Sequence, residues 1–347
     1  MRRFTRTLVT AAVAVAAVVG TAGWASGDSQ RAVTGPPPGA DAWRADTEGG
    51  RPLPDPAAAS PGEVARFFAA LDEGAQRRLL HRHPLVVGNL DGAPLPLRYE
   101  ANRLAVAATG EARYASLAAP DRQVLAFDPR GRGQVAEVFG DLAHAAHVSV
   151  VVPGSDNDAS RHDDRRREGT GPAGMARSLR TAAGGGTAVI AWTGYTTPVG
   201  VGLDAADGRL AKAGAVRLAR FTAGLDAVGA PDPVLFCHSY GSVVCGLAAR
   251  DTDATDVVVL GSPGMRAGSA AALHTGARVW AARGPSDWIA DVPHVEFAGI
   301  GHGADPASPA FGARRVPAAD VQGHTGYFAS GTRSLAAFAA IAKGELR

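Results

Sequence analysis

Two kinds of hydrophobic pattern divide the chain near residue 120. Between residues 60 and 108, apolar side chains such as Val64, Phe68 and Leu71 recur at helical spacing. The sequence Ser60-Pro61-Gly62-Glu63 before this run has the cap, first-turn proline and acidic side chain typical of a helix start. We therefore expect a helical segment over residues 59–118.

Beyond residue 120, short apolar runs alternate with stretches of helical periodicity. Strands are predicted over 124–128, 135–139, 148–152, 188–192, 234–237, 257–260, 279–282 and 295–298, and helices over 174–183, 205–228, 240–249, 267–274 and 333–342. Continuous apolar strands that alternate with helices are typical of a parallel sheet covered on both faces. The predicted fold class is therefore α/β, in one domain over residues 119–347.

The amino terminus has the pattern of a targeting segment. Arg2, Arg3 and Arg6 precede an uncharged apolar run over 8–23, which small residues follow. The run is also close to the length of a membrane-spanning helix. We expect residues 1–27 to be a signal peptide or a membrane anchor, which places the protein outside the cytoplasm, secreted or in the cell envelope. Residues 28–58, rich in Gly, Pro, Asp and Ala, are predicted to be a disordered linker.

Composition narrows the classes of function. The 35 basic and 33 acidic residues leave a formal net charge of +2, so we expect no binding of a polyanion such as nucleic acid. Cys237 and Cys245 are too few for a disulfide scaffold or a four-thiolate zinc site, and we expect buried thiols, with a disulfide as the alternative. No metal or cofactor is expected, because the Gly-x-Gly-x-x-Gly match at 169–174 follows a charged run and not a strand.

The strongest local signal for chemistry lies at residues 234–244. An apolar strand, then Cys237-His238-Ser239-Tyr240-Gly241, then a helical run match the Gly-x-Ser-x-Gly nucleophile elbow, with Cys in place of the first Gly. Such a turn strains the serine backbone, and its neighbours two positions away must be small. Ser239 is therefore the predicted nucleophile. His238 is expected to point away from it and to be structural.

A serine nucleophile needs a histidine base and a carboxylate that orients the base, and in this fold both follow the serine in the order acid, then histidine. Asp287 follows the strand at 279–282 and a Gly-Pro turn, which makes it the predicted acid, with Asp291 as its nearest rival. His324 lies in a glycine-flanked loop before the last helix and is the predicted base. His302, which directly follows a predicted strand, is its rival.

Two backbone N–H groups are also needed to hold the oxyanion that forms during acyl transfer. One is predicted on Tyr240, directly after the nucleophile. The second is predicted on Ser155, in the loop that follows an early central strand. Pro153 cannot donate, and Gly154 allows that loop to come close to the substrate.

Several motifs occur in an order that resembles one family. They are Val87-Gly88-Asn89-Leu90-Asp91-Gly92, Val152-Pro153-Gly154, Ala191-Trp192-Thr193-Gly194-Tyr195, the elbow at Ser239, and Gly323-His324 with Tyr327-Phe328. The combination is similar to an exported bacterial α/β-hydrolase family of uncharacterised function. From residue 60 to the end, the resemblance implies an α/β-hydrolase fold with Ser239 as nucleophile and His324 as base. It implies no substrate.

Together these features predict an exported serine hydrolase, esterase-like, that acts through an acyl-enzyme on a small-molecule or lipid-like acyl substrate. An amidase, a thioesterase or an acyltransferase with the same three residues is an alternative. A second alternative is a non-catalytic cell-envelope protein that keeps the hydrolase scaffold as a binding surface.

Overall fold

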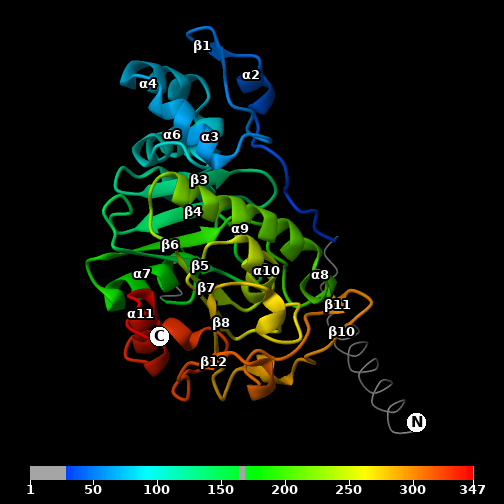
Figure 1. The fold of residues 1–347 in the computed structure, drawn as a ribbon. Coiled ribbons are helices and arrows are strands. Elements are labelled where there is room, and N and C mark those ends of the chain that lie inside the picture. Colours follow the sequence, from blue (N-terminus) through cyan, green and yellow to red (C-terminus); the bar gives the residue numbers. More distant parts are fainter. Residues whose placement is uncertain (1–28, 164–168, 347) are drawn as a thin grey trace.

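An eight-stranded sheet forms the centre of the molecule (Figure 1). The computed structural model describes residues 29–163 and 169–346, so the predicted targeting segment over 1–27 lies outside the described residues. The strand order is β12-β9-β8-β7-β5-β6-β4-β3, and all neighbours are parallel except β3–β4 and β4–β6. The strands are β3 (Gln123–Asp128), β4 (Gln134–Phe139), β5 (His147–Val152), β6 (Thr187–Thr193), β7 (Val234–His238), β8 (Asp256–Leu260), β9 (Arg278–Ala282) and β12 (Arg314–Arg315).

Helices cover this sheet on both faces. α9 (Arg209–Ala227) and α10 (Gly241–Ala248) share one hydrophobic core with the sheet, and α7 (Pro172–Ala183) and α11 (Arg333–Ala342) share another. Successive strand side chains point to opposite faces, and in β5 Val150 and Val152 therefore belong to the first core while Val151 belongs to the second. The predicted α/β class with a mostly parallel sheet is confirmed.

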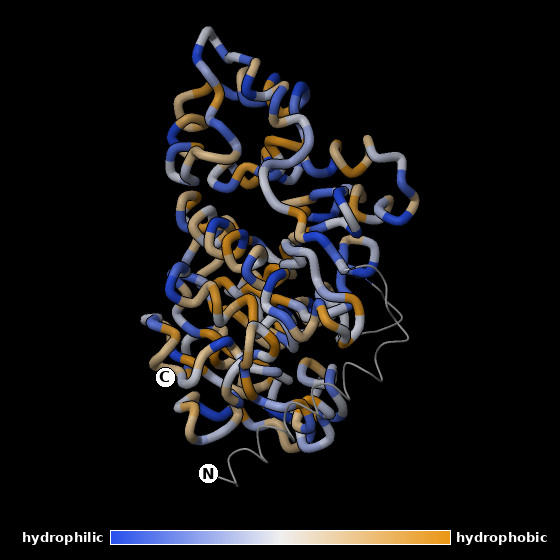
Figure 2. The backbone as a smooth tube through the Cα atoms, turned by 90° about the vertical axis from the view of Figure 1, so that its right-hand side faces the viewer, coloured by the Kyte–Doolittle hydropathy of each residue, from blue (hydrophilic) through white to orange (hydrophobic). Residues whose placement is uncertain are grey.

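The N-terminal helices lie against the β3 edge of the sheet (Figure 1). They are α3 (Pro61–Ala69), α4 (Glu73–Arg82), α5 (Pro84–Asn89) and α6 (Leu95–Ala108), followed by a 3-10 helix over Ala112–Ala118. α3 begins with the predicted cap, in which Ser60 and Glu63 hydrogen-bond each other's backbone N–H groups. Hydrophobic stretches gather inside this segment and, separately, around the sheet (Figure 2). The expectation of a helical segment is confirmed.

The prediction of a disordered linker over residues 28–58 is wrong for the part that the structure describes, 29–58. This part forms the short helix α2 (Ala40–Arg44) and a hairpin of β1 (Thr47–Glu48) and β2 (Arg51–Pro52). Trp43 is fully buried with Leu53 in the core of the N-terminal helices, and its indole Nε1–H donates to the Pro54 carbonyl oxygen at 2.7 Å. One large aromatic side chain therefore fixes a segment of otherwise small and polar residues.

Two predicted elements in the C-terminal half of the chain, 267–274 and 295–298, also differ from the structure. Residues 295–298 do not join the sheet but form an outlying hairpin of β10 (Glu296–Phe297) and β11 (Ile300–Gly301), because Ile300 pairs with Asp207 just after α8 (Leu203–Ala206). The predicted helix at 267–274 shrinks to a 3-10 turn over Ala271–Leu273. The other 3-10 turns are Ala249–Asp251, Trp288–Asp291, Pro309–Phe311 and Gly326–Phe328.

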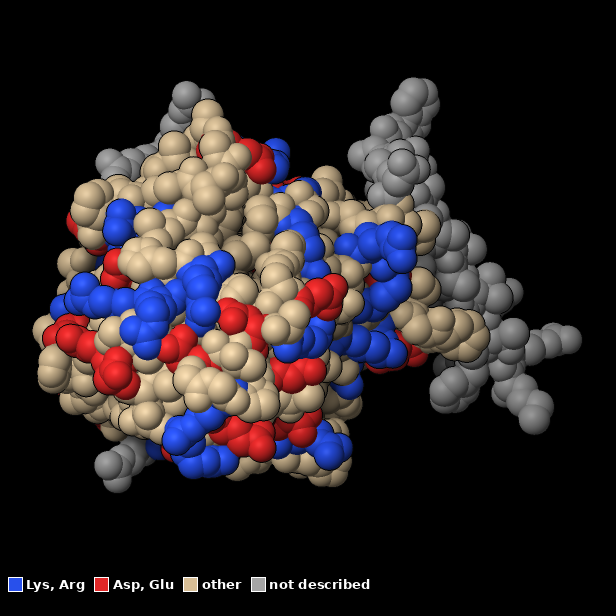
Figure 3. Space-filling view, turned by 90° about the horizontal axis from the view of Figure 1, so that it is seen from above, with Lys and Arg blue, Asp and Glu red and all other residues tan. Residues whose placement is uncertain are grey.

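The described part of the surface mixes both signs of charge. On the face that Figure 3 shows, basic and acidic side chains are interspersed, in keeping with the small net charge of +2. Within residues 29–163 and 169–346, no helix is both long and apolar enough to cross a bilayer.

Candidate active site

Ser239 occupies a sharp turn between the end of β7 and the start of α10. Its φ is +55°, a left-handed conformation that is uncommon for a residue with a side chain. The turn depends on glycine at two neighbouring places. A Cβ atom on Gly241 would overlap the carbonyl oxygen of Val152, and one on Gly154 would lie 2.6 Å from the Cβ atom of Ser239. The backbone packs this closely only because both positions lack a side chain.

Three predicted residues meet at this turn. The Ser239 Oγ atom lies 2.8 Å from Nε2 of His324, and His324 Nδ1 lies 2.8 Å from Oδ1 of Asp287. An ionised carboxylate can only accept a hydrogen bond, so Nδ1 carries the proton. Nε2 is then free to accept a hydrogen bond from the serine hydroxyl. Gly261 (φ +54°) makes room for this pair, because a Cβ atom there would lie 2.8 Å from Asp287 Oδ2.

The Asp287 carboxylate is buried and held by several donors. Besides His324, it accepts from the Tyr327 hydroxyl at 2.5 Å and from the Ile289 N–H at 3.0 Å. The Tyr327 hydroxyl in turn accepts from the Gly284 N–H at 3.1 Å. Burial alone would raise the pKa of Asp287, but these hydrogen bonds outweigh it and hold the pKa below its ordinary value. The carboxylate therefore stays ionised beside the imidazole.

His238 contributes to the site in a way that the sequence analysis did not foresee. Its Nε2 lies 2.7 Å from the backbone oxygen of His324, and the two imidazole rings are 4.8 Å apart. A carbonyl oxygen only accepts, so His238 donates from Nε2. Burial, and then the nearby His324, lower the pKa of His238 to about 4. His238 is thus a neutral group that anchors the backbone of the predicted base. A polar residue at the end of an apolar strand is the signal that could have indicated it.

The loop after β5 brings the predicted oxyanion donors to the serine. A Cβ atom on Gly154 would lie 3.0 Å from the Tyr240 nitrogen, so this loop and the start of α10 meet beside Ser239. Within the described residues, the N–H groups of Tyr240 and Ser155 have no hydrogen-bond acceptor. The N–H groups directly after Ser239 and directly after Gly154 are therefore two backbone donors without a partner among the described residues.

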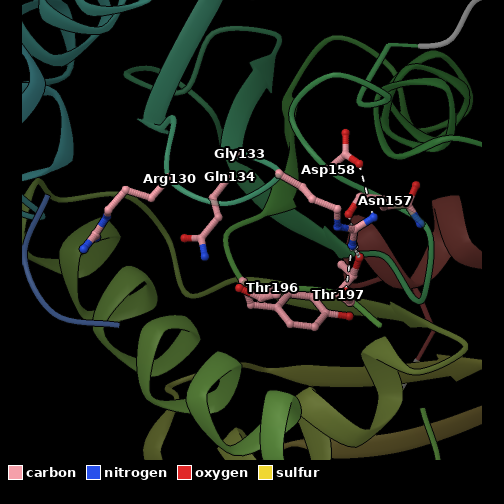
Figure 4. A pocket seen from close by; sticks show the side chains of 9 residues that line it. Arg130, Gly133, Gln134, Asn157, Asp158, Thr196 and Thr197 are labelled. Atoms are coloured by element: carbon pink, nitrogen blue, oxygen red, sulfur yellow. Dashed lines mark hydrogen bonds and ion pairs between the residues drawn. The ribbon is translucent and has the colours of Figure 1, made fainter. Parts of the chain in front are cut away.

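Hydrogen bonds from the Asn157 and Thr197 side chains hold the loop after β5 in place. Asn157 donates to the carbonyl oxygens of Gly154 (3.1 Å) and Ser155 (2.8 Å). The Thr197 hydroxyl donates to the Asn157 carbonyl oxygen at 2.6 Å. Figure 4 shows that Asn157, Asp158 and Thr197 line one small pocket. The carbonyl oxygens of Gly154 and Ser155 are thus held by the Asn157 side chain, while the Ser155 N–H has no acceptor among the described residues.

The rival residues lie elsewhere. Nε2 of His302 contacts the Ala205 carbonyl oxygen at 2.7 Å, and its ring packs edge-on against Tyr240. Asp291 is exposed at the end of its 3-10 turn. Neither side chain has a hydrogen bond to Ser239 or His324 among the described residues.

Cys237 and Cys245 form a disulfide, so the expectation of two buried thiols is wrong. Their Cα atoms are 6.4 Å apart, with Cys237 at the end of β7 and Cys245 on α10. The small side chain required two residues before the serine is therefore also the point at which strand and helix are covalently joined.

A mostly parallel sheet with a nucleophile elbow between strand and helix defines the α/β-hydrolase class. Residues 128–297 match the family model described as "Alpha/beta hydrolase". Over these residues the chain is similar to this α/β-hydrolase family, and the curated relatives that match it are uncharacterised. Two of them, from Mycobacterium tuberculosis strains CDC 1551 and H37Rv, are each 29% identical in an alignment of 385 positions that covers 84% of this chain. The chain spans 57% of the length of these relatives.

Two solved structures are also similar to this chain. A dienelactone hydrolase from Anabaena variabilis ATCC 29413 is 17% identical, with a TM-score of 0.40, and the match covers 61% of this chain and 90% of that one. A predicted CIB-like hydrolase from Thermoplasma acidophilum is 12% identical, with a TM-score of 0.41, and the match covers 65% and 98% of the two chains.

The buried histidines make stability depend on pH. Burial lowers the pKa of both His238 and His302 to about 4, against about 6.5 in an unfolded chain. Between these values the unfolded chain binds protons that the folded chain does not, so the free energy of unfolding falls as the pH drops from 6.5 to about 4. We expect His302→Gln to reduce this slope by up to about 1.4 kcal/mol per pH unit.

Urea unfolding at pH 7, 6 and 5 measures this slope. The same substitution at His81, an exposed histidine on α4, is the matched control. A slope that is equal in wild type and His302→Gln would show that His302 is not held neutral in the folded protein.

Proposed function

We propose that the protein is a serine hydrolase that cleaves carboxylic esters through an acyl-enzyme. The observation that carries the proposal is the pair of hydrogen bonds, each of 2.8 Å, that join Ser239 Oγ to His324 and His324 to Asp287. Ser239 lies in a strained turn, and two backbone donors of the turn and the adjoining loop are unpaired among the described residues. A buried carboxylate, an imidazole of defined tautomer and a serine hydroxyl in this order are the parts that acyl transfer requires.

The first half-reaction forms the acyl-enzyme. His324 Nε2 takes the proton of the Ser239 hydroxyl while Oγ bonds to the ester carbonyl carbon. The Tyr240 and Ser155 N–H groups stabilise the oxyanion, and Asp287 stabilises the imidazolium. The bond from the carbonyl carbon to the alcohol oxygen then breaks, and His324 gives its proton to the leaving alcohol.

The second half-reaction releases the acid. His324 takes a proton from water, and the resulting hydroxide oxygen bonds to the acyl carbon. When the bond to Ser239 Oγ breaks, His324 returns the proton to the serine. The net reaction consumes one water and yields one carboxylic acid and one alcohol. It requires no metal or organic cofactor.

The role of Ser239 can be tested with a fluorophosphonate probe. We expect the probe to label the folded wild type, and Ser239→Ala to abolish labelling and to lower kcat on a short-chain ester by about 10⁴-fold or more, because the nucleophile is lost. His324→Ala should have a comparable effect. His302→Ala, whose ring contacts α8 instead, is the control that should keep most of the turnover.

Other outcomes discriminate between the alternatives. Turnover that survives His324→Ala but not His302→Ala would overturn the assignment of the base. Absence of labelling in a protein that circular dichroism shows to be folded would favour a binding protein on a hydrolase scaffold.

His238 is proposed as a positioning residue for His324. Its replacement by Phe keeps the volume similar but removes the hydrogen bond to the His324 backbone oxygen. We expect kcat to fall by about 10-fold to 100-fold with little change in KM, because a base displaced by a fraction of an ångström still permits substrate binding. His238→Gln retains a donor and should recover part of kcat. Equal losses in both variants, or a loss confined to KM, would argue against positioning.

We also propose that the protein acts outside the cytoplasm, in the cell envelope or the medium. The basic residues and apolar run over 1–23 support export, as does the disulfide at the elbow, since such bonds persist mainly in oxidising compartments. Amino-terminal sequencing and non-reducing mass spectrometry of protein from an expressing bacterium should find cleavage near residue 27 and two fewer hydrogens at the cysteines. An uncleaved protein with intact anchor would instead remain with the membrane fraction, and one found in the cytosol with free thiols would contradict export.

A further inference from the structure

Most large apolar side chains that are exposed in the described residues lie in two stretches near Ser239. The first stretch precedes and begins α8, and the second follows β9. We call them together the apolar rim, with the members Val199 (55% exposed), Val201 (55%), Leu203 (60%), Trp288 (44%), Val295 (43%) and Phe297 (78%). Single exposed apolar residues are ordinary, whereas a cluster of them marks a binding surface.

The first stretch is fastened to the loop that carries the predicted oxyanion donor. The N–H of Asp156, the residue after Ser155, donates to the Pro198 carbonyl oxygen at 2.8 Å. The Asp156 carboxylate in turn accepts from the Gly200 N–H at 3.0 Å. Val199 lies between these two attachment points, so its exposed side chain is held next to the loop that carries Ser155.

The second stretch is fastened to the histidine and to the other oxyanion donor. The Trp288 ring centroid is 4.6 Å from that of His324. The hairpin that carries Phe297 pairs through Ile300 with Asp207, whose carbonyl oxygen accepts from the Tyr240 hydroxyl at 2.9 Å. In Figure 1, α8 and the β10–β11 hairpin lie side by side. The first stretch is therefore anchored at Asp156, beside the predicted donor Ser155, and the second at His324 and Tyr240, which adjoin Ser239.

We propose, building on the proposed ester hydrolysis, that the apolar rim binds the acyl chain of the substrate, so that the preferred substrates are esters of medium or long aliphatic acids. Residues 198–203 carry no charged side chain, so the stretch itself presents no ionised group that a hydrocarbon chain laid along it would desolvate. Each methylene removed from water there raises kcat/KM by up to about fourfold. The occupant is a substrate chain because both stretches of the rim are attached to residues of the candidate site or to their direct neighbours.

The test compares p-nitrophenyl acetate, butyrate and octanoate. In wild type, kcat/KM should rise from acetate to octanoate. In the triple variant Val199→Ser, Val201→Ser, Leu203→Ser, the octanoate-to-acetate ratio of kcat/KM should fall by about tenfold or more, and Phe297→Ser should lower it in the same direction. Val216→Ser, at a 73% exposed valine on α9, is the matched control. A wild-type ratio that does not rise with chain length, or a ratio unchanged in the triple variant, overturns the proposal.

A binding measurement separates this inference from the proposed reaction. Sodium octanoate is titrated into the Ser239→Ala protein, with and without the triple substitution, by isothermal calorimetry. If no ester is hydrolysed, but octanoate binds and the triple substitution weakens its binding, chain binding at the rim is supported and the proposed reaction is overturned. If esters are hydrolysed without chain-length preference, the reaction stands and the rim fails. Absence of both turnover and octanoate binding overturns both.

Discussion

The site depends on how closely three backbone segments approach one another around Ser239. The end of β5, the end of β7 and the start of α10 leave no space for a Cβ atom at Gly154 or Gly241, and Ser239 itself adopts a positive φ. Interiors are packed too tightly for such a turn to relax by small adjustments. The same approach that strains the serine brings the loop that carries the unpaired Ser155 N–H against the unpaired Tyr240 N–H. Strain and donor placement are thus one structural feature.

The imidazole of His324 is positioned through contacts to both its ring and its backbone. Asp287 holds the ring through Nδ1, and His238 holds the backbone oxygen of the same residue. Both groups are buried, and burial by itself favours the neutral form of each. The carboxylate keeps its charge because three donors surround it, while the His238 imidazole, which has no acid partner, stays neutral. A protonated His238 would face the imidazolium that the proposed reaction forms, so its low pKa suits a supporting role.

Much of the fold and the main site residues could be predicted because they follow from local patterns. No knowledge of long-range contacts is needed to recognise apolar strands, the small residues two positions before and after Ser239, or the chain order of acid and histidine. His238 and Tyr327 could not be found in this way, since their partners lie 86 and 40 residues away in sequence. The segment 29–58 was misjudged for a related reason. Its composition resembles a linker, and only the packing of Trp43 against distant helices overrides that composition.

The site has buried, hydrogen-bonded polar residues at its centre and the exposed apolar rim at its edge. The topology of the sheet explains why both come from the same loops. Loops leave the sheet at the carboxyl ends of its strands, where one residue turns inward and the next outward. After β9, Asp287 is buried under His324 while Trp288, its neighbour, is 44% exposed. After β5, Gly154 lies against Ser239 while Asp156, two residues on, fastens the loop that carries Val199. In the proposed reaction and the proposed chain binding, neighbouring residues of one loop thus have separate roles, the buried ones in proton transfer and the exposed apolar ones at the rim.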